Sequence, residues 1–255
     1  SAKKDKKNEN VYISTTVALA SKYPIKNLKR VEIDFSALKK HYFEGFFKFA
    51  REPIKATVIL PNGKELNVYV CHLKSNRDNE FEYIFTKDTT LKEKIEKTTK
   101  ALKENYSLSL KQRLCEASSL FSDIKQTNKP SVLLTDLNDK EFSLTIDVLS
   151  NIKYHENNLS KDEYLLLDAY HLDKKELYNP HPEFKGIKRV PTSYFAGKGN
   201  VLDYIFISSH FDKKKNNNIG KVSSYEVFNK HLEKNQNGSL LQSDHAQVVC
   251  EIEYL

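Results

Sequence analysis

A short apolar run ends in polar side chains in the stretch Ser131-Val132-Leu133-Leu134-Thr135-Asp136-Leu137-Asn138-Asp139. Pro130 precedes it and stops the helical pattern before it, because proline cannot continue a helix. The run Ser131–Leu134 therefore has the length and composition of a buried strand. Asp136 and Asn138 then stand at the end of that strand, where a rigid scaffold can hold them in register.

Three other predicted strands carry polar side chains at one end. Val68–Cys71 runs into His72, and Asp203 comes directly before the apolar run Tyr204–Ser208. Asp244 and His245 stand immediately before the last strand of the chain. Side chains delivered by four strand ends can assemble into one preorganised site.

The residue types of this set suit a hard divalent cation. Asp136, Asn138 and Asp244 offer oxygen ligands, and the sequence has neither paired thiolates nor a close His pair to favour zinc. Mg²⁺ keeps several waters and uses few carboxylates together with phosphate oxygens, so it is the first expectation, with Mn²⁺ or Ca²⁺ as alternatives.

The two histidines suit a phosphate group. His72 and His245 can donate to a phosphate whose charge grows in a transition state. A carboxylate such as Asp203 behind His245 would set its tautomer and stabilise its charged form. Lys74 and Arg77, just past His72, are candidates to hold a flanking phosphate.

Each of these residues also has a structural interpretation. An Asp-Leu-Asn sequence such as Asp136-Leu137-Asn138 often makes a turn or a helix cap. His72 can be a hydrogen-bonded structural residue, Asp203 an edge-strand cap and Asp244 a turn residue. Ordinary solvated charges remain an alternative for Lys74 and Arg77. The order and strand context of the four segments carry the functional interpretation.

The rest of the chain predicts a mixture of hairpins and helices. The Asn62-Gly63 pair between two extended runs is a strong hairpin signal. Apolar spacing predicts helices within 89–124 and over 143–149, and it predicts strands at the following positions: Val11–Ser21, Val31–Phe35, Ala56–Leu60, Glu65–Cys71, Tyr164–Ala169, Val201–Ser208 and Ala246–Tyr254. The expected fold class is α/β (α+β), with two sheets packed together and helices outside.

Composition narrows the class of protein. The net charge of +7 favours a polyanionic partner, nucleic acid or an anionic lipid surface, although solvated lysines explain it as well. No apolar run approaches the roughly 20 residues that span a bilayer, so we expect no transmembrane segment. Three cysteines without CxxC spacing argue against a disulfide framework and a structural zinc site. Cys71 and Cys250 are expected to be buried, as is the aromatic cluster Phe43, Phe46, Phe47 and Phe49.

We find no internal repeat and no linker. Residues 1–10 are charged and Asn-rich, as in a loop or a frayed end. Residues 11–255 are expected to form one domain, and a monomer.

The order of the motifs resembles the bacterial endonuclease/exonuclease/phosphatase family, which has the deoxyribonuclease-I-like fold. The similarity covers roughly residues 11–255 and rests on these segments in family order: Arg51-Glu52-Pro53-Ile54, His72-Leu73-Lys74-Ser75, Arg113, Thr135-Asp136-Leu137-Asn138-Asp139, Leu202-Asp203-Tyr204-Ile205-Phe206 and Ser243-Asp244-His245. One departure is Thr135, where the family usually has glycine.

The resemblance implies a four-layered sandwich, two sheets flanked by helices, and a role for each motif residue. Asp136 would help to activate a water, Asn138 would hold the metal–phosphate site, and Asp244 would bind the metal. His245, paired with Asp203, would contact the scissile phosphate, and His72 would donate to it from the opposite side. The resemblance leaves the compartment open, cytoplasmic or exported.

The family's two opening strands have no counterpart upstream of Val11. They carry an Asn and a metal-binding Glu, so the domain is expected to be incomplete at its N-terminus. A chain without them is expected to bind metal weakly and to turn over slowly.

Three hypotheses follow. The first is a metal-dependent phosphodiesterase that acts as a nuclease on DNA or RNA. The second is a phospholipid or phosphoinositide phosphodiesterase or a phosphatase, since the same catalytic set serves a lipid head group, and Tyr194-Phe195 could then contact lipid. The third is an inactive binding module that keeps the fold.

Overall fold

The structure, a computed structural model, describes residues 5–8, 15–76, 84–155, 165–173, 189–195, 198–215, 218–232 and 243–255. The strands are β1 (Ile25–Lys29), β2 (Ile54–Ile59), β3 (Glu65–His72), β4 (Ser131–Asp136), β5 (Leu166–Asp168), β6 (Ser193–Phe195), β7 (Lys198–Asn200), β8 (Asp203–Ser208), β9 (Gly220–Phe228) and β10 (Gln247–Tyr254). The α-helices are α1 (Phe35–Lys40), α2 (Leu91–Lys103), α3 (Leu108–Thr127) and α4 (Leu144–Ser150), and short 3₁₀ turns lie at Ile152–His155, Ala169–His171 and Ser209–Phe211.

A six-stranded mixed sheet forms the centre, in the order β1-β2-β3-β4-β8-β5. β3 and β4 run parallel, and the other neighbouring strands pair antiparallel. A second sheet pairs β9 with β10, and a third pairs β6 with β7. The predicted mixed α/β class is confirmed.

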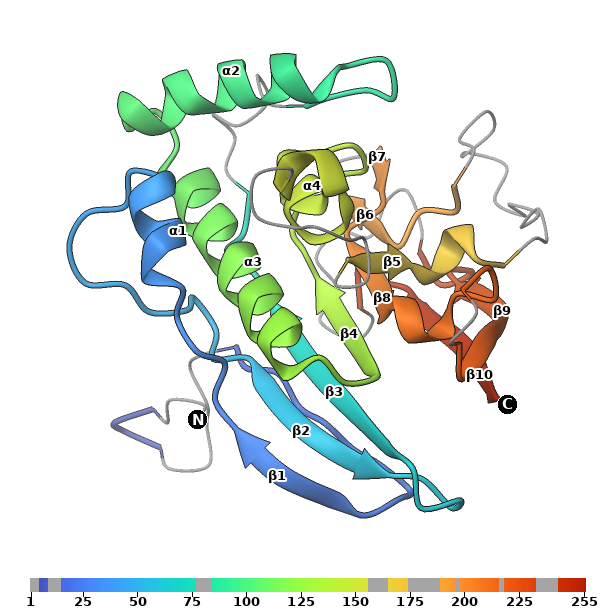
Figure 1. Cartoon of the computed structure of the whole chain (residues 1–255). Helices are drawn as coiled ribbons and strands as arrows, with labels where there is room; N and C mark the ends of the chain where they lie inside the picture. The colour runs from blue at the N-terminus through green and yellow to red at the C-terminus, as the bar shows by residue number, and fades with distance from the viewer. Residues whose placement is uncertain are drawn as a thin grey trace.

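The helices cover one face of the six-stranded sheet (Figure 1). Side chains alternate between the faces of a strand, so every second residue points to the helices. Tyr69, Leu133 and Phe206 lie on this face in one buried cluster with Leu114 and Leu120 of α3. The 20-residue helix α3 is buried along most of its length and forms the centre of this layer.

The opposite face of the sheet packs on the β9–β10 sheet, which lies on the other side of β4 and β8 in Figure 1. Val132, Ile205 and Ile207 meet Val222 and Tyr225 of β9 there. Alternate side chains of a central strand therefore pack on the helices and on the β9–β10 sheet.

Local signals explain where the predicted elements begin and end. Thr90 and Glu93 form a reciprocal capping box at the start of α2, and Ser107 caps α3. Asn128 ends α3 in the left-handed conformation that amides tolerate (φ 45°). Gly63 adopts φ 77° in the turn between β2 and β3, which confirms the predicted hairpin.

The prediction of a strand at Val31–Phe35 is wrong. Its backbone N–H groups bond to side chains of α3 instead of to a neighbouring strand: Glu32 donates to Asp123 (3.0 Å) and Asp34 donates to Ser119 (3.1 Å). Asp34 then accepts N–H bonds at the start of α1 and ends the extended segment.

The predicted strand Val11–Ser21 is wrong over 15–21, which form no strand, and residues 11–14 lie outside the described part. The structure also has four strands that the sequence did not predict: β1, β6, β7 and β9. β9 begins inside the segment 213–221, whose Lys- and Asn-rich composition is typical of a loop. A register shift opposite Glu251 and Ile252 breaks the two-residue alternation that would have identified it.

Burial follows the predictions with two exceptions. Phe47 and Phe49 are buried and Phe43 packs against them, but Phe46 is 88% exposed. Cys71 is buried, whereas Cys250 is only half-buried. All three cysteines are free, as expected. Among the described residues, no helix has the length and apolar character needed to cross a membrane.

The ring of His41 at the end of α1 is buried, and its Nε2 lies 3.1 Å from the hydroxyl of Ser118 on α3. Burial, assisted by the charge of Lys40, lowers the pKa of His41 from 6.5 to about 3. Between these two values the unfolded chain binds the extra proton, so the unfolding free energy rises with pH across this window. As pH falls from about 6.5 to about 3, the contribution of His41 is lost.

We therefore expect His41→Gln, which keeps a donor for Ser118, to flatten the pH dependence of stability in this window. Urea denaturation of both proteins at a series of pH values measures the effect. Equal slopes for the two proteins would contradict it.

Candidate functional site

Three neighbouring strands bring His72, Asp136 and Asp203 to one edge of the six-stranded sheet. β3 and β4 run parallel, with His72 paired to Asp136 at their ends. β8 runs antiparallel to β4 and begins at this edge, with Asp203 paired to Asp136. The three side chains predicted from separate strand ends are therefore consecutive across the sheet.

His245 reaches the same edge from the segment before β10. An isolated bridge pairs His245 with Ser193, and the backbone of Ala246 donates to the carbonyl of Thr192 (2.6 Å). The backbone of Tyr194 donates to the carbonyl of Asp244 (3.0 Å). These bonds fix the backbone of His245 against β6.

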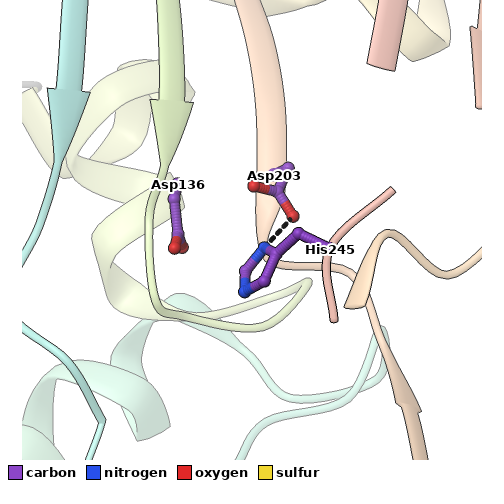
Figure 2. Close-up of side chains that lie close together, drawn as sticks. All are labelled: Asp136, Asp203 and His245. Atoms are coloured by element: carbon purple, nitrogen blue, oxygen red, sulfur yellow. Dashed lines mark hydrogen bonds and ion pairs between the residues drawn. The ribbon is translucent and has the colours of Figure 1, made fainter. Parts of the chain in front are cut away.

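Asp136, Asp203 and His245 form one compact cluster, in which one ligand-type atom of each lies within 4.8 Å of the others. Figure 2 shows the imidazole of His245 between the two carboxylates, with its Nδ1 2.8 Å from Asp203 Oδ2. On the other side, His72 Nε2 lies 3.2 Å from Asp136 Oδ2. The site therefore contains two carboxylate–histidine pairs.

The surroundings of these groups shift their pKa values in different directions. The hydrogen bond to Asp203 raises the pKa of His245 to about 9, against the effect of burial. Burial lowers the pKa of His72 to about 4, assisted by the positive charge of Arg51. Burial and the charge of Asp203 raise the pKa of Asp136 to about 6. At pH 7 the cluster thus holds a charged His245, a neutral His72 and an ionised Asp136.

Asn138 lies in the turn after β4, in the left-handed conformation (φ 50°). Its backbone N–H donates to Asp136 Oδ1 (2.8 Å), and its side-chain Nδ2 donates to the carbonyl of Leu73 (3.1 Å). The two bonds orient both Asn138 and Asp136. No donor in the described part of the chain contacts the amide oxygen of Asn138, which keeps that oxygen available to a ligand.

The other predicted site residues lie differently. Asp244 is exposed, next to His245 in the chain, and is not one of the three clustered groups. Lys74 holds the loop after β3 through its backbone, and its side chain lines a groove beside the site. Arg77 lies outside the described residues.

Two residues that were not proposed for the site support it. Thr192 donates its hydroxyl to Asp203 Oδ2 (2.8 Å) and accepts the backbone N–H of Asp203 (3.0 Å), so it orients the carboxylate that binds His245. Arg51 donates to the carbonyl of Leu73 (2.8 Å) and to the hydroxyl of Ser75 (3.1 Å). Arg51 belongs to a quoted motif, but nothing in the sequence around Thr192 distinguishes it from a loop threonine.

Two buried residues of α3 hold the loops that carry the site. Arg113 donates to Asp139 Oδ2 and to the carbonyl of Lys74, both at 3.1 Å. Glu116 accepts the backbone N–H groups of Lys74 (2.7 Å) and Ala50 (2.6 Å). The loop after β3 and the loop after β4 are thereby tied to the same helix.

The donor set fits a divalent cation that is held by few protein oxygens. Asp136 and Asn138 supply a carboxylate and an amide oxygen from one turn. Asp203 is already bonded to His245 and Thr192, and a protonated His245 offers no lone pair to a metal. A hard ion that keeps several waters, such as Mg²⁺, matches this sparse set better than zinc does.

No model of a known protein family matches the chain, and no curated protein matches it either. Solved structures do match. The human Nocturnin catalytic domain with bound sulfate anion is 16% identical, with a TM-score of 0.48, over 91% of this chain and 60% of that one. An endonuclease/exonuclease/phosphatase from Beutenbergia cavernae is 15% identical, with a TM-score of 0.48, over 92% of this chain and 46% of that one.

The Xenopus laevis APE2 catalytic domain also matches, at 12% identity and a TM-score of 0.37, over 80% of this chain and 56% of that one. The chain spans about half to three-fifths of the length of these structures (46% to 60%). Similarity at this level assigns no activity, which has to come from the site itself.

The pairing of Asp203 with His245 can be tested without any substrate. In Asp203→Asn the carboxylate is lost, so the pKa of His245 falls from about 9 toward its ordinary value. Proton NMR titration of the imidazole ring measures it. In the matched variant Asp244→Asn the fall is smaller, because the charge of Asp244 contributes least. Equal shifts in the two variants would contradict the pairing.

Proposed function

We propose that this chain is a divalent-metal-dependent phosphodiester hydrolase, a nuclease that cleaves DNA or RNA by in-line attack of water. One observation carries the proposal: the ends of β3, β4 and β8 and the segment before β10 bring two carboxylate–histidine pairs together at one sheet edge. Titratable groups whose pKa values are shifted by burial together with a specific charge partner cluster at functional sites.

Asp136 is the proposed acceptor of the proton of the attacking water. It is ionised at neutral pH, yet its raised pKa leaves it basic enough to take a proton. The backbone N–H of Asn138 fixes one of its oxygens, so the other faces His72 and the site.

His245 is the proposed contact to the scissile phosphate. Asp203 accepts from its Nδ1 and keeps the ring charged, which leaves the Nε2–H free to donate to a phosphate oxygen. A fixed positive charge stabilises the extra negative charge that develops as water attacks. Thr192 is a positioning residue in this scheme, since it acts through Asp203.

His72 was predicted to donate to the phosphate from the opposite side. Here its Nε2 contacts Asp136 Oδ2, so the neutral ring also orients the proposed base. Asp136 and Asn138 would hold the cation, with Asp244 as a further ligand candidate. A bound Mg²⁺ would polarise the phosphate and lower the pKa of a water molecule.

Nucleic acid is the proposed substrate because the chain carries a net charge of +7, and phosphate contacts supply most of the affinity of nucleases for their substrates.

Nicking of supercoiled plasmid with Mg²⁺ tests the proposal. We expect wild type to nick, EDTA to abolish the reaction, and Asp136→Ala to lower the rate by roughly 10²-fold or more, as expected for loss of a general base. The matched control Asp88→Ala removes an exposed carboxylate in the turn before α2 and should leave the rate unchanged. A folded wild type without nicking would contradict the nuclease assignment, and hydrolysis of phospholipid in its place would support the lipid alternative.

The pH profile of the reaction tests the role of His245. Activity should fall above pH about 9, as His245 loses its proton. In Asp203→Asn this upper limb moves to lower pH, since the variant lacks the hydrogen bond that raises the pKa. Initial rates across the pH range measure the shift. An unchanged upper limb would show that another group controls it.

A further inference from the structure

A groove of about 880 Å³ lies between the loop 43–50 and the N-terminal half of α3. Among the residues that line it are two exposed apolar side chains, Phe46 and Leu108, and three lysines, Lys48, Lys74 and Lys111. None of them belongs to the carboxylate–histidine cluster. The groove is therefore a separate feature whose lining combines an aromatic ring with positive charge.

The loop that carries Phe46 is held in place by its neighbours. Phe47 and Phe49 are buried in the core and pack edge-on, with 5.6 Å between ring centroids. Lys111 Nζ donates to the carbonyl of Tyr42 (2.7 Å), and Gln112 donates to the carbonyl of Lys48 (2.8 Å). The backbone on both sides of Phe46 is thus bonded to α3.

Phe46 itself points into solvent and is 88% exposed. Gly45 before it adopts φ 84°, a conformation that favours glycine. Together with Leu108, which is 68% exposed, Phe46 gives the groove exposed apolar surface beside its lysines.

The charge of the groove favours an anionic partner. Three lysines line it, against one acidic side chain, Glu44. Lys48 and Lys74 have no carboxylate partner among the residues that the structure describes. The ammonium of Lys111, a buried residue, donates to two neutral oxygens, those of Tyr42 and Asn105.

The groove also adjoins the proposed active site along the chain. Lys74 follows His72 by two residues, and Ala50 at the other lip precedes Arg51. Arg51 in turn donates to the carbonyl of Leu73, which lies between His72 and Lys74. Each side of the groove therefore lies one or two residues along the chain from Arg51 or His72.

We propose that this groove binds a single-stranded segment of nucleic acid beside the scissile phosphodiester, with a base stacked on Phe46 and phosphates held by Lys48 and Lys74. The proposal rests on the nuclease function proposed above and names a part of its substrate site. Aromatic rings beside cations are the usual means of binding single strands, because every base has a π-face. The lysines Lys48 and Lys74 line this groove together with apolar residues, so the lining offers charge for phosphates beside apolar surface for bases.

The chain contains no tryptophan, so Phe46→Trp places one fluorescent reporter at the proposed stacking position. We expect a single-stranded oligonucleotide to quench this fluorescence, in EDTA so that no cleavage occurs. Anisotropy of a labelled strand should show that Phe46→Ala weakens binding by roughly tenfold or more, the size of one lost base stack. Phe35→Ala is the matched control: Phe35 is also exposed, on α1, but does not line the groove.

Lys48→Gln combined with Lys74→Gln should weaken binding and reduce its dependence on salt, since fewer counterions are released. Absence of quenching, or equal loss in Phe46→Ala and Phe35→Ala, would overturn the proposal. So would equal affinity for inorganic polyphosphate, which has no bases, or preferential binding to phosphatidylglycerol vesicles.

These measurements separate a failure of the binding proposal from a failure of the hydrolase proposal. Asp136→Ala in the Phe46→Trp background should keep the quenching while it loses nicking. If the oligonucleotide quenches Phe46→Trp but wild type does not nick plasmid, the proposed hydrolase is wrong and the single-strand binding site remains. Nicking without quenching would keep the nuclease and remove the groove from its substrate path.

Discussion

The buried pair of ionic side chains on α3, Arg113 and Glu116, is the constraint on which the site depends. Arg113 contacts Asp139 and the carbonyl of Lys74, and Glu116 accepts the N–H groups of Lys74 and Ala50. A buried charge is costly unless its hydrogen bonds are satisfied, so these groups tolerate few alternative arrangements. The loops after β3 and β4 are thereby set relative to each other, and with them the positions of His72 and Asp136.

The same helix supports the groove. Gln112 precedes Glu116 by one turn, and together with Lys111 it holds the backbone of the loop that carries Phe46. One helical surface thus positions both the carboxylate–histidine cluster and the proposed binding surface beside it. Since residues one turn apart lie on one face of a helix, a single rigid element can serve both purposes.

Within the cluster, burial and neighbouring groups give chemically similar side chains different pKa values. Asp203 is bonded to His245 and Thr192 and keeps its partner charged. Asp136, buried near that charge-bearing carboxylate, is pushed toward a higher pKa, while His72 beside it stays neutral. Two carboxylates and two histidines can therefore take four different roles, which hydrolysis of a phosphodiester requires.

The amino-acid sequence alone determined the main strands, the two long helices and the polar strand ends, because periodicity, capping and turn residues act over short distances. It also predicted that His72, Asp136, Asp203 and His245 belong together, since each follows or precedes a recognisable strand. Only the tertiary structure decided that 31–35 bond to α3 instead of forming a strand, that β9 pairs with β10, and that Thr192 orients Asp203. It also decided that Phe46, alone in its aromatic cluster, faces water. These features depend on contacts between residues far apart in the chain, such as Glu32 and Asp123, which no local pattern encodes.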